Sequence, residues 1–132
     1  MNTFPLTIVT PDGRLFDAPV ESFLVRTENG DVQILAGHAD FVGAIGTGRA
    51  VLRTASGTRH AAMSGGFLSV QGGAVTAVAM TCEFREDIDV ARAERSRAQA
   101  EERLRTARDT QQIAAAKAKL ARALARLSVA NM

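Results

Sequence analysis

The spacing of apolar residues changes partway along the chain. Up to residue 84, apolar residues come in short runs that alternate with polar ones and are bounded by turn residues. Alternation with a period of two is typical of strands that bury one face, and many short strands at even spacing predict an antiparallel sandwich or barrel. The predicted strands are Phe4–Thr10, Arg14–Asp17, Val20–Thr27, Val32–Leu35, Ala50–Arg53, Thr58–Met63, Phe67–Val70 and Ala74–Met80.

Turn residues separate these predicted strands. Asn29-Gly30 is a strong signal for a two-residue hairpin, because glycine accepts the positive φ that such turns need. The remaining separators are Pro11-Asp12-Gly13, Ser56-Gly57, Gly65-Gly66 and Gln71-Gly72-Gly73. Gly43–Arg49 superficially resembles a phosphate-binding loop, but it lacks the Gly-Lys-Ser/Thr ending and strand-like residues follow it. We therefore predict a turn there.

From residue 87 onward the apolar period becomes that of a helix. A second helix is predicted from one apolar stripe, formed by Ile113, Ala116, Leu120, Leu124 and Leu127. The first helix has only Ile88, Val90 and Leu104 as large apolar residues, and a turn is expected near Arg108–Thr110. One buried Leu or Ile contributes about 1.5–3 kcal/mol, and ordering a residue costs about as much. The helical hairpin should therefore be marginal without a partner.

Composition changes at the same place as the period. All 11 glycines lie at or before Gly73, and all 6 phenylalanines lie at or before Phe84. Residues 1–84 carry 5 Arg and 7 Asp/Glu, a net charge of −2, whereas residues 85–132 carry 11 Arg/Lys and 7 Asp/Glu, a net charge of +4. Such a shift marks a change of structural class. We predict an antiparallel β-sandwich domain over residues 1–85 and an α-helical hairpin over residues 86–132.

Candidate catalytic groups are isolated from one another. His38 and His60 have no ligand cluster around them, the single Cys82 has no partner thiol, and Ser64 lacks the flanks of a nucleophile elbow. Neither an enzyme nor a metal site is predicted. The chain has no run near the roughly 18 apolar residues of a membrane span and no leader pattern, so we expect neither membrane insertion nor a targeting peptide.

The basic tail leaves two kinds of partner open. Clustered arginines are an electrostatic footprint for nucleic acid, but acidic residues interrupt this run and no aromatic residue is present to stack on bases. An acidic protein surface is the better match. Two interpretations remain. The chain is either a protein-binding subunit of a larger complex or an independent β-sandwich module that binds nucleic acid or an acidic protein through its helical tail.

Three arginines are predicted to converge. If the two helices run antiparallel around a turn near Arg108-Asp109, Arg92 lies opposite the turn that carries Arg122 and Arg126. Their mutual repulsion would weaken the hairpin, and a bound phosphate would reverse that effect. The other interpretation is that Asp89 pairs with Arg92 at i, i+3 while the two other arginines point to water.

Four segments together resemble a known family. They are Gly30–Ala39 (GDVQILAGHA), Met63–Gln71 (MSGGFLSVQ), Ile88–Ala93 (IDVARA) and Leu120–Ala130 (LARALARLSVA), and they occur in this order. In combination they resemble the epsilon subunit of bacterial F-type (rotary) ATP synthases, over essentially the whole chain. The resemblance implies a β-sandwich of about ten strands followed by a two-helix hairpin.

The resemblance also implies a set of partners. It places the chain in the central rotor stalk, bound to the gamma subunit and the c-subunit ring, where it couples proton or other ion transport to ATP synthesis without being a catalyst. Glu28, Asn29, Gly30 and Asp31 would approach the ring, and His38 would lie near gamma. The helices would extend towards the alpha/beta catalytic subunits and inhibit ATP hydrolysis. No nucleic acid is implied, and the location would be peripheral, on the cytoplasmic face of the bacterial inner membrane.

The segment Ile88–Ala93 is similar to the ATP-recognition pattern of this family. By that resemblance, Ile88 and Ala93 would flank adenine and Asp89 would accept hydrogen bonds there. Arg92, Arg122 and Arg126 would meet the phosphates. No cofactor is required by this prediction, and ATP enters it as a regulatory ligand.

Overall fold

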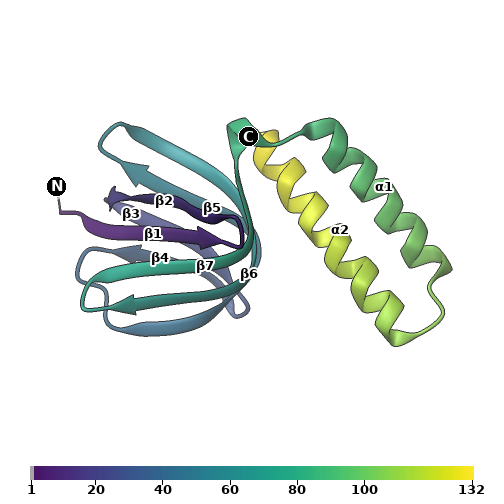
Figure 1. Ribbon diagram of the computed structural model, residues 1–132, viewed down its shortest axis with the longest axis horizontal. Helices are drawn as coiled ribbons and strands as arrows, with labels where there is room; N and C mark the ends of the chain where they lie inside the picture. The colour runs from purple at the N-terminus through teal and green to yellow at the C-terminus, as the bar shows by residue number, and fades with distance from the viewer. Residues whose placement is uncertain (1) are drawn as a thin grey trace.

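The computed structural model describes residues 2–132 and contains seven strands, a short 3₁₀ helix and two α-helices (Figure 1). These elements are β1 (Phe4–Thr10), β2 (Gly13–Val20), β3 (Ser22–Thr27), β4 (Gly30–Leu35), β5 (Phe41–Thr54), β6 (Gly57–Gln71), β7 (Ala74–Phe84), η1 (Arg85–Asp87), α1 (Val90–Thr106) and α2 (Thr110–Ala130). The strands form one sheet in the order β2-β1-β7-β6-β5-β3-β4, curled into the predicted sandwich. The β-sandwich followed by a helical hairpin is thus confirmed.

The number of strands is seven, not about ten, because three strands are long enough to serve both layers. β5, β6 and β7 have 14, 15 and 11 residues, against a usual five or six. In β6, Ala61 and Met63 face the core before Gly65-Gly66, whereas Leu68 and Val70 face it afterwards. Both glycines have positive φ, 70° and 96°, which lets the strand bend and exchange its faces without ending.

Two further expectations about the sheet are wrong. Gly43–Arg49 is not a turn but part of β5, where pairing with β3 skips from Ala50 to Ile45. This irregularity lets β5 follow the bend of the sheet. Gly46 allows the Thr27 carbonyl of β3 to approach closely, and Gly48 leaves room for the Arg26 side chain. The sheet is also not wholly antiparallel, because β1 pairs with β7 in parallel.

The hydrophobic core is built from the strands alone. Its largest fully buried side chains are those of Phe23, Leu6, Ile8, Ile34, Leu52 and Leu68. No residue of α1 or α2 belongs to this core cluster within the described part of the chain. The predicted hairpin at Asn29-Gly30 is confirmed, with Thr27 paired to Gly30, whose φ is 114°. The sandwich therefore has the means to be stable without the helices.

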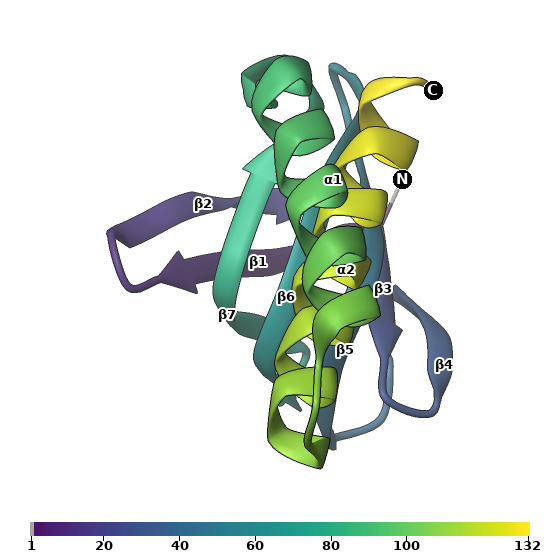
Figure 2. The ribbon, with the colours of Figure 1, turned by 90° about the vertical axis from the view of Figure 1, so that its right-hand side faces the viewer.

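The two helices lie in layers outside the sheet. α2 covers β5 and β6, and α1 lies on the far side of α2 (Figures 1 and 2). Asp89 and Asp109 cap their first turns by accepting backbone N–H groups at 3.0 and 2.7 Å. Among residues 2–132, no helix is long and apolar enough to span a membrane.

The buried face of each helix is narrow and made mostly of alanine. α1 buries only Ala93 and Ala100. α2 buries Ala116, Ala123, Leu127 and Val129. The predicted stripe on α2 is only partly correct, since Ile113 and Leu124 remain 37% and 47% exposed. A helix held between a sheet and a second helix buries two narrow strips, and small residues there let the neighbours approach closely.

Candidate functional site

A basic cavity of about 560 Å³ lies between the two helices and the end of β7. Its lining includes five of the six predicted nucleotide-site residues. The lining residues are Glu83, Asp87, Asp89, Arg92, Ala93, Ser96, Arg103, Lys119, Arg122 and Arg126. Ile88, the sixth, is half-buried just before α1 and does not line the cavity. The antiparallel hairpin thus brings Arg92, Arg122 and Arg126 to one place.

Helical spacing explains this convergence. On α1, Arg92, Ser96 and Arg103 lie on one face, because they are separated by four and seven residues. On α2, Arg122 and Arg126 are separated by four residues and line the same cavity as the α1 residues. The turn at residues 107–109 is short, so these two faces are held opposite each other.

Arg126 is held by an acid from the sheet. Its Nε donates to the Oε1 of Glu83 in β7. The Arg126 side chain is 24% exposed, so the expectation that it points to water is wrong. Among residues 2–132, this is the only side-chain hydrogen bond or ion pair that joins α1 or α2 to a strand. It therefore links α2 to β7.

Asp89 does not pair with the Arg92 guanidinium. Its Oδ1 instead accepts the backbone N–H of Arg92 at 3.0 Å as the N-cap of α1. The Arg92 side chain is exposed and forms no ion pair with the residues that the structure describes. The guanidinium is therefore left to face the cavity.

The electrostatics of the cavity favour an anion. Five of its lining residues are basic and three are acidic, and one acid is already paired with Arg126. Arg92, Arg103, Lys119 and Arg122 have no ion-pair partner in the described chain. Several guanidinium groups around one space match the geometry of phosphate oxygens.

Sequence reasoning missed five residues that line the cavity: Glu83, Asp87, Ser96, Arg103 and Lys119. Three of them could have been found, because they lie at helical spacing from Arg92 or Arg122. Glu83 could not, because it lies on a strand, and only the docking of α2 brings it to Arg126.

The predicted partner residues lie at the two ends of β4. Glu28, Asn29, Gly30 and Asp31 form the β3–β4 turn, where Asp31 accepts from Arg26 Nε at 2.6 Å and raises the pKa of that guanidinium. His38 follows β4, and its ring lies edge-on to Phe41 at 6.2 Å. The structure therefore does not bring the turn and His38 together.

An exposed apolar patch lies on the outer face of the sheet. We call Val42, Ala44, Phe67, Val78 and Met80 the outer patch. Phe67 pairs with Ala44 on β5 and with Val78 on β7, so the side chains of this row share one face. Val42 is 74% exposed, Met80 63% and Phe67 48%. The patch was not predicted, because alternation shows that a strand has two faces but not which face stays uncovered.

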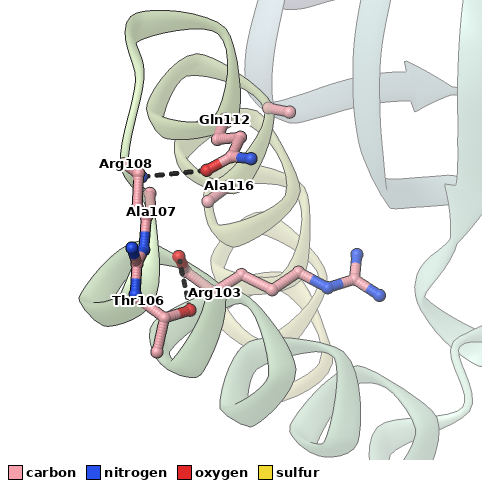
Figure 3. Close-up of a pocket in the computed structure, with 7 residues that line it drawn as sticks. Arg103, Thr106, Ala107, Arg108, Gln112 and Ala116 are labelled. Atoms are coloured by element: carbon pink, nitrogen blue, oxygen red, sulfur yellow. Dashed lines mark hydrogen bonds between the residues drawn. The ribbon is translucent and has the colours of Figure 1, made fainter.

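A second cavity of about 430 Å³ lies at the helix–helix turn (Figure 3). Gln112 closes this turn by accepting the backbone N–H of Arg108 at 2.9 Å, and Thr106 donates to the carbonyl of Arg103. Apart from these groups its lining is mainly alanine. It contains none of the predicted site residues.

No described residue shows the environment of a catalytic nucleophile or a metal ligand set. Burial, together with the neighbouring Glu83 carboxylate, raises the pKa of the Cys82 thiol to about 12, so the reactive thiolate is scarce at neutral pH. Among residues 2–132, no three His, Cys, Asp or Glu side chains are placed to hold a metal ion.

The fold and the cavity define a class: a β-sandwich that carries a folded-back helical hairpin, with a basic cavity beneath α1. Two family profiles match, the ATP synthase delta/epsilon chain beta-sandwich domain at residues 3–85 and the long alpha-helix domain at residues 86–131. The ATP synthase epsilon chain of Bacillus velezensis is 42% identical over 131 residues, covering 99% of both chains. That of Ruminococcus albus is 37% identical over 132 residues, covering 99% of this chain and 98% of the relative. The chain belongs to the ATP synthase delta/epsilon chain family.

Solved structures show the same fold at lower identity. A chain of the Euglena gracilis mitochondrial ATP synthase (OSCP/F1/c-ring) has a TM-score of 0.83 at 23% identity, covering 98% of this chain and 82% of its own. A chain of the Tetrahymena thermophila mitochondrial ATP synthase (central stalk/c-ring) has a TM-score of 0.69 at 14% identity, covering 96% and 95%.

Proposed function

We propose that this chain is a non-catalytic subunit of the central stalk of a bacterial F-type ATP synthase. In this role it binds the gamma subunit and the c-subunit ring and couples ion transport to ATP synthesis. It is peripheral to the cytoplasmic face of the inner membrane. Support comes from the match of both family profiles and from full-length relatives named ATP synthase epsilon chain.

The outer patch is the observation that carries this proposal. An isolated exposed apolar residue is ordinary, but adjacent ones on three neighbouring strands are typical of a protein–protein interface. We propose that gamma covers this patch, with His38 near its edge. The β3–β4 turn, with Glu28 and Asp31, would contact the polar loops of the ring.

Replacing Phe67 with serine is expected to weaken gamma binding at least about tenfold, since a central aromatic residue is often a hot spot of 2 kcal/mol or more. Co-purification of gamma with the tagged chain, followed by titration, measures the loss. Leu15→Ser is the matched control, because Leu15 is also exposed and apolar but lies on β2. Equal gamma binding by both variants and the unmodified chain would place the interface elsewhere.

The helical hairpin is proposed to regulate ATP hydrolysis. α2, the helix that covers the sheet, buries only Leu127 and Val129 as large apolar residues, and within residues 2–132 one ion pair links the helices to the strands, so few contacts hold the hairpin on the sheet. An element that is marginal in one packing is suited to adopt a second one. Extended towards the alpha/beta catalytic subunits, the hairpin would inhibit hydrolysis. Some arginines of the hairpin form ion pairs with acids of their own helix, as Arg97 does with Glu94. This pairing argues against nucleic acid as the partner of the hairpin.

ATP is proposed as the ligand of the basic cavity. Binding only to the docked form would stabilise the docked hairpin by RT ln(1 + [L]/Kd), about 2.7 kcal/mol at a hundredfold excess over Kd. ATP would thereby retain the helices in their non-inhibiting position. This proposal is supported by the lining of the cavity, in which Asp89 and Arg92 of the α1 end and two arginines of α2 surround one space.

Millimolar ATP is expected to raise the melting temperature of the isolated chain by several degrees, and Arg92→Ala should remove most of that gain. Differential scanning fluorimetry measures both. Arg108→Ala is the control, because it removes an arginine at the hairpin turn without touching the basic cavity. The ATP proposal fails if the unmodified chain shows no shift.

A further inference from the structure

Lys119 contributes an uncompensated charge to the basic cavity. Its Nζ donates to the Oε1 of Gln99 at 2.8 Å across the two helices. Gln99 is neutral, and Lys119 forms no ion pair with any described residue. Lys119 is half-buried and lines both the basic cavity and a smaller one beside it. Gln99 therefore sets the position of the Lys119 ammonium group without neutralising its charge.

The hydrogen bond with Gln99 orients the ammonium group. A lysine carries three N–H donors, and Gln99 accepts one of them, so two remain for a ligand. A free lysine side chain would lose rotamer freedom on binding an anion, and part of that entropy is already lost here. Gln99 thus acts as a positioning residue for Lys119.

Lys119 lies at one end of a row of positive charges. On α2, Lys119, Arg122 and Arg126 follow one another at three and four residues and therefore share a face. At 1.5 Å per residue the row spans about 10 Å along the helix axis. Arg126 lies at the end near β7, where Glu83 holds it, and Lys119 lies at the end towards the hairpin turn.

The start of α1 lies near the Arg126 end of this row, because the two helices are antiparallel. Asp89 and Ala93 are there, whereas Gln99 lies further along α1, opposite Lys119. A nucleotide with its base at Asp89 and Ala93 would direct its phosphate chain from Arg92 and Arg126 towards Lys119. Each added phosphate would reach further along the row.

We propose that Lys119, positioned by Gln99, binds the terminal phosphate of ATP and sets the preference of the cavity for ATP over ADP. This inference rests on the proposed ATP site and adds to it the residue that distinguishes the triphosphate. ADP lacks the group that reaches Lys119, and AMP lacks both outer phosphates.

A purely structural role for Lys119 predicts a different pattern. If the Lys119–Gln99 bond only joined the helices, losing it would weaken ATP, ADP and AMP binding by the same factor. Binding of the terminal phosphate instead predicts a selective loss of ATP affinity. The ratio of the dissociation constants for ATP and ADP therefore separates the two roles.

Isothermal titration of the full chain with ATP, ADP and AMP tests the proposal. Lys119→Met should weaken ATP binding about tenfold, the effect of one charge-assisted hydrogen bond at a partly exposed site, and leave ADP binding within about twofold. Lys119→Arg should keep most of the preference for ATP. Lys117→Met is the matched control, since Lys117 is exposed on the same helix and outside the cavity.

The outcomes distinguish the inference from the proposed function. If Arg92→Ala abolishes ATP binding but Lys119→Met leaves the ATP/ADP ratio unchanged, the inference is wrong and the ATP site stands. If the unmodified chain binds no ATP, both fail. Equal loss of all three nucleotides on Lys119→Met assigns Lys119 a structural role and also overturns the inference.

Discussion

Gly66→Ala is expected to destabilise the protein by more than about 4 kcal/mol, enough to prevent stable folding of a small domain. A Cβ atom on Gly66 would overlap the carbonyl oxygen of Val78 on β7, and that oxygen belongs to the backbone. The φ of 96° adds strain for any residue with a side chain. The two strands would have to separate at the bend that lets them serve both layers.

Gly72→Ala provides the control for this prediction. Gly72 also has a positive φ, 57°, but a Cβ atom there would meet no atom within 4 Å. Its replacement should cost only about 1–2 kcal/mol, the penalty of the left-handed conformation. Urea unfolding and the yield of soluble protein compare the variants. Similar urea midpoints for both variants would mean that β6 and β7 can relax around a side chain at residue 66. That result would contradict this explanation of the bend in β6.

Truncation after Arg85 is expected to abolish the inhibition of ATP hydrolysis while leaving gamma binding intact. Added to a catalytic complex that lacks this subunit, the full chain should lower ATPase activity severalfold. Residues 1–85 should bind the same complex and have no such effect, because the proposed inhibitory contacts lie in the helices. A steady-state ATPase assay, together with co-sedimentation of the added chain, measures both properties.

The truncated chain is expected to fold. All residues of its core cluster lie between Phe4 and Phe84, and the helices cover the outside of the sheet rather than entering that core. The outer patch is unaffected by removal of the helices, so gamma binding is retained in this proposal. Equal inhibition by residues 1–85 and the full chain would show that the helices are not the inhibitory element.

The local elements of this fold could be predicted from the sequence because their signals are local. The Asn29-Gly30 hairpin follows from the conformational freedom of glycine, and the start of α2 follows from the polar turn before it. The convergence of Arg92 with the arginines of α2 also follows from helical spacing and a short turn.

Features that depend on long-range packing could not be predicted. Gly65-Gly66 looks like a turn, and only the continuous register of β6 with its neighbours shows that the strand continues through it. Leu124 fits the apolar stripe but stays exposed, because Ala123 and Leu127 face the neighbours of α2. Glu83 joins the cavity only through the docking of α2, and the outer patch depends on which sheet face the helices leave uncovered.

Hydrogen–deuterium exchange on the isolated full chain, without nucleotide, tests most directly whether the hairpin is held weakly. Exchange through local opening reports the free energy that holds each element in place. α1 buries only Ala93 and Ala100, and α2 buries only Leu127 and Val129 as large apolar residues. Because only one ion pair joins the helices to the strands within residues 2–132, the amides of both helices should exchange much faster than those of β6. Protection of α1 and α2 equal to that of β6 would contradict this account, because a hairpin held so firmly could not act as a switch.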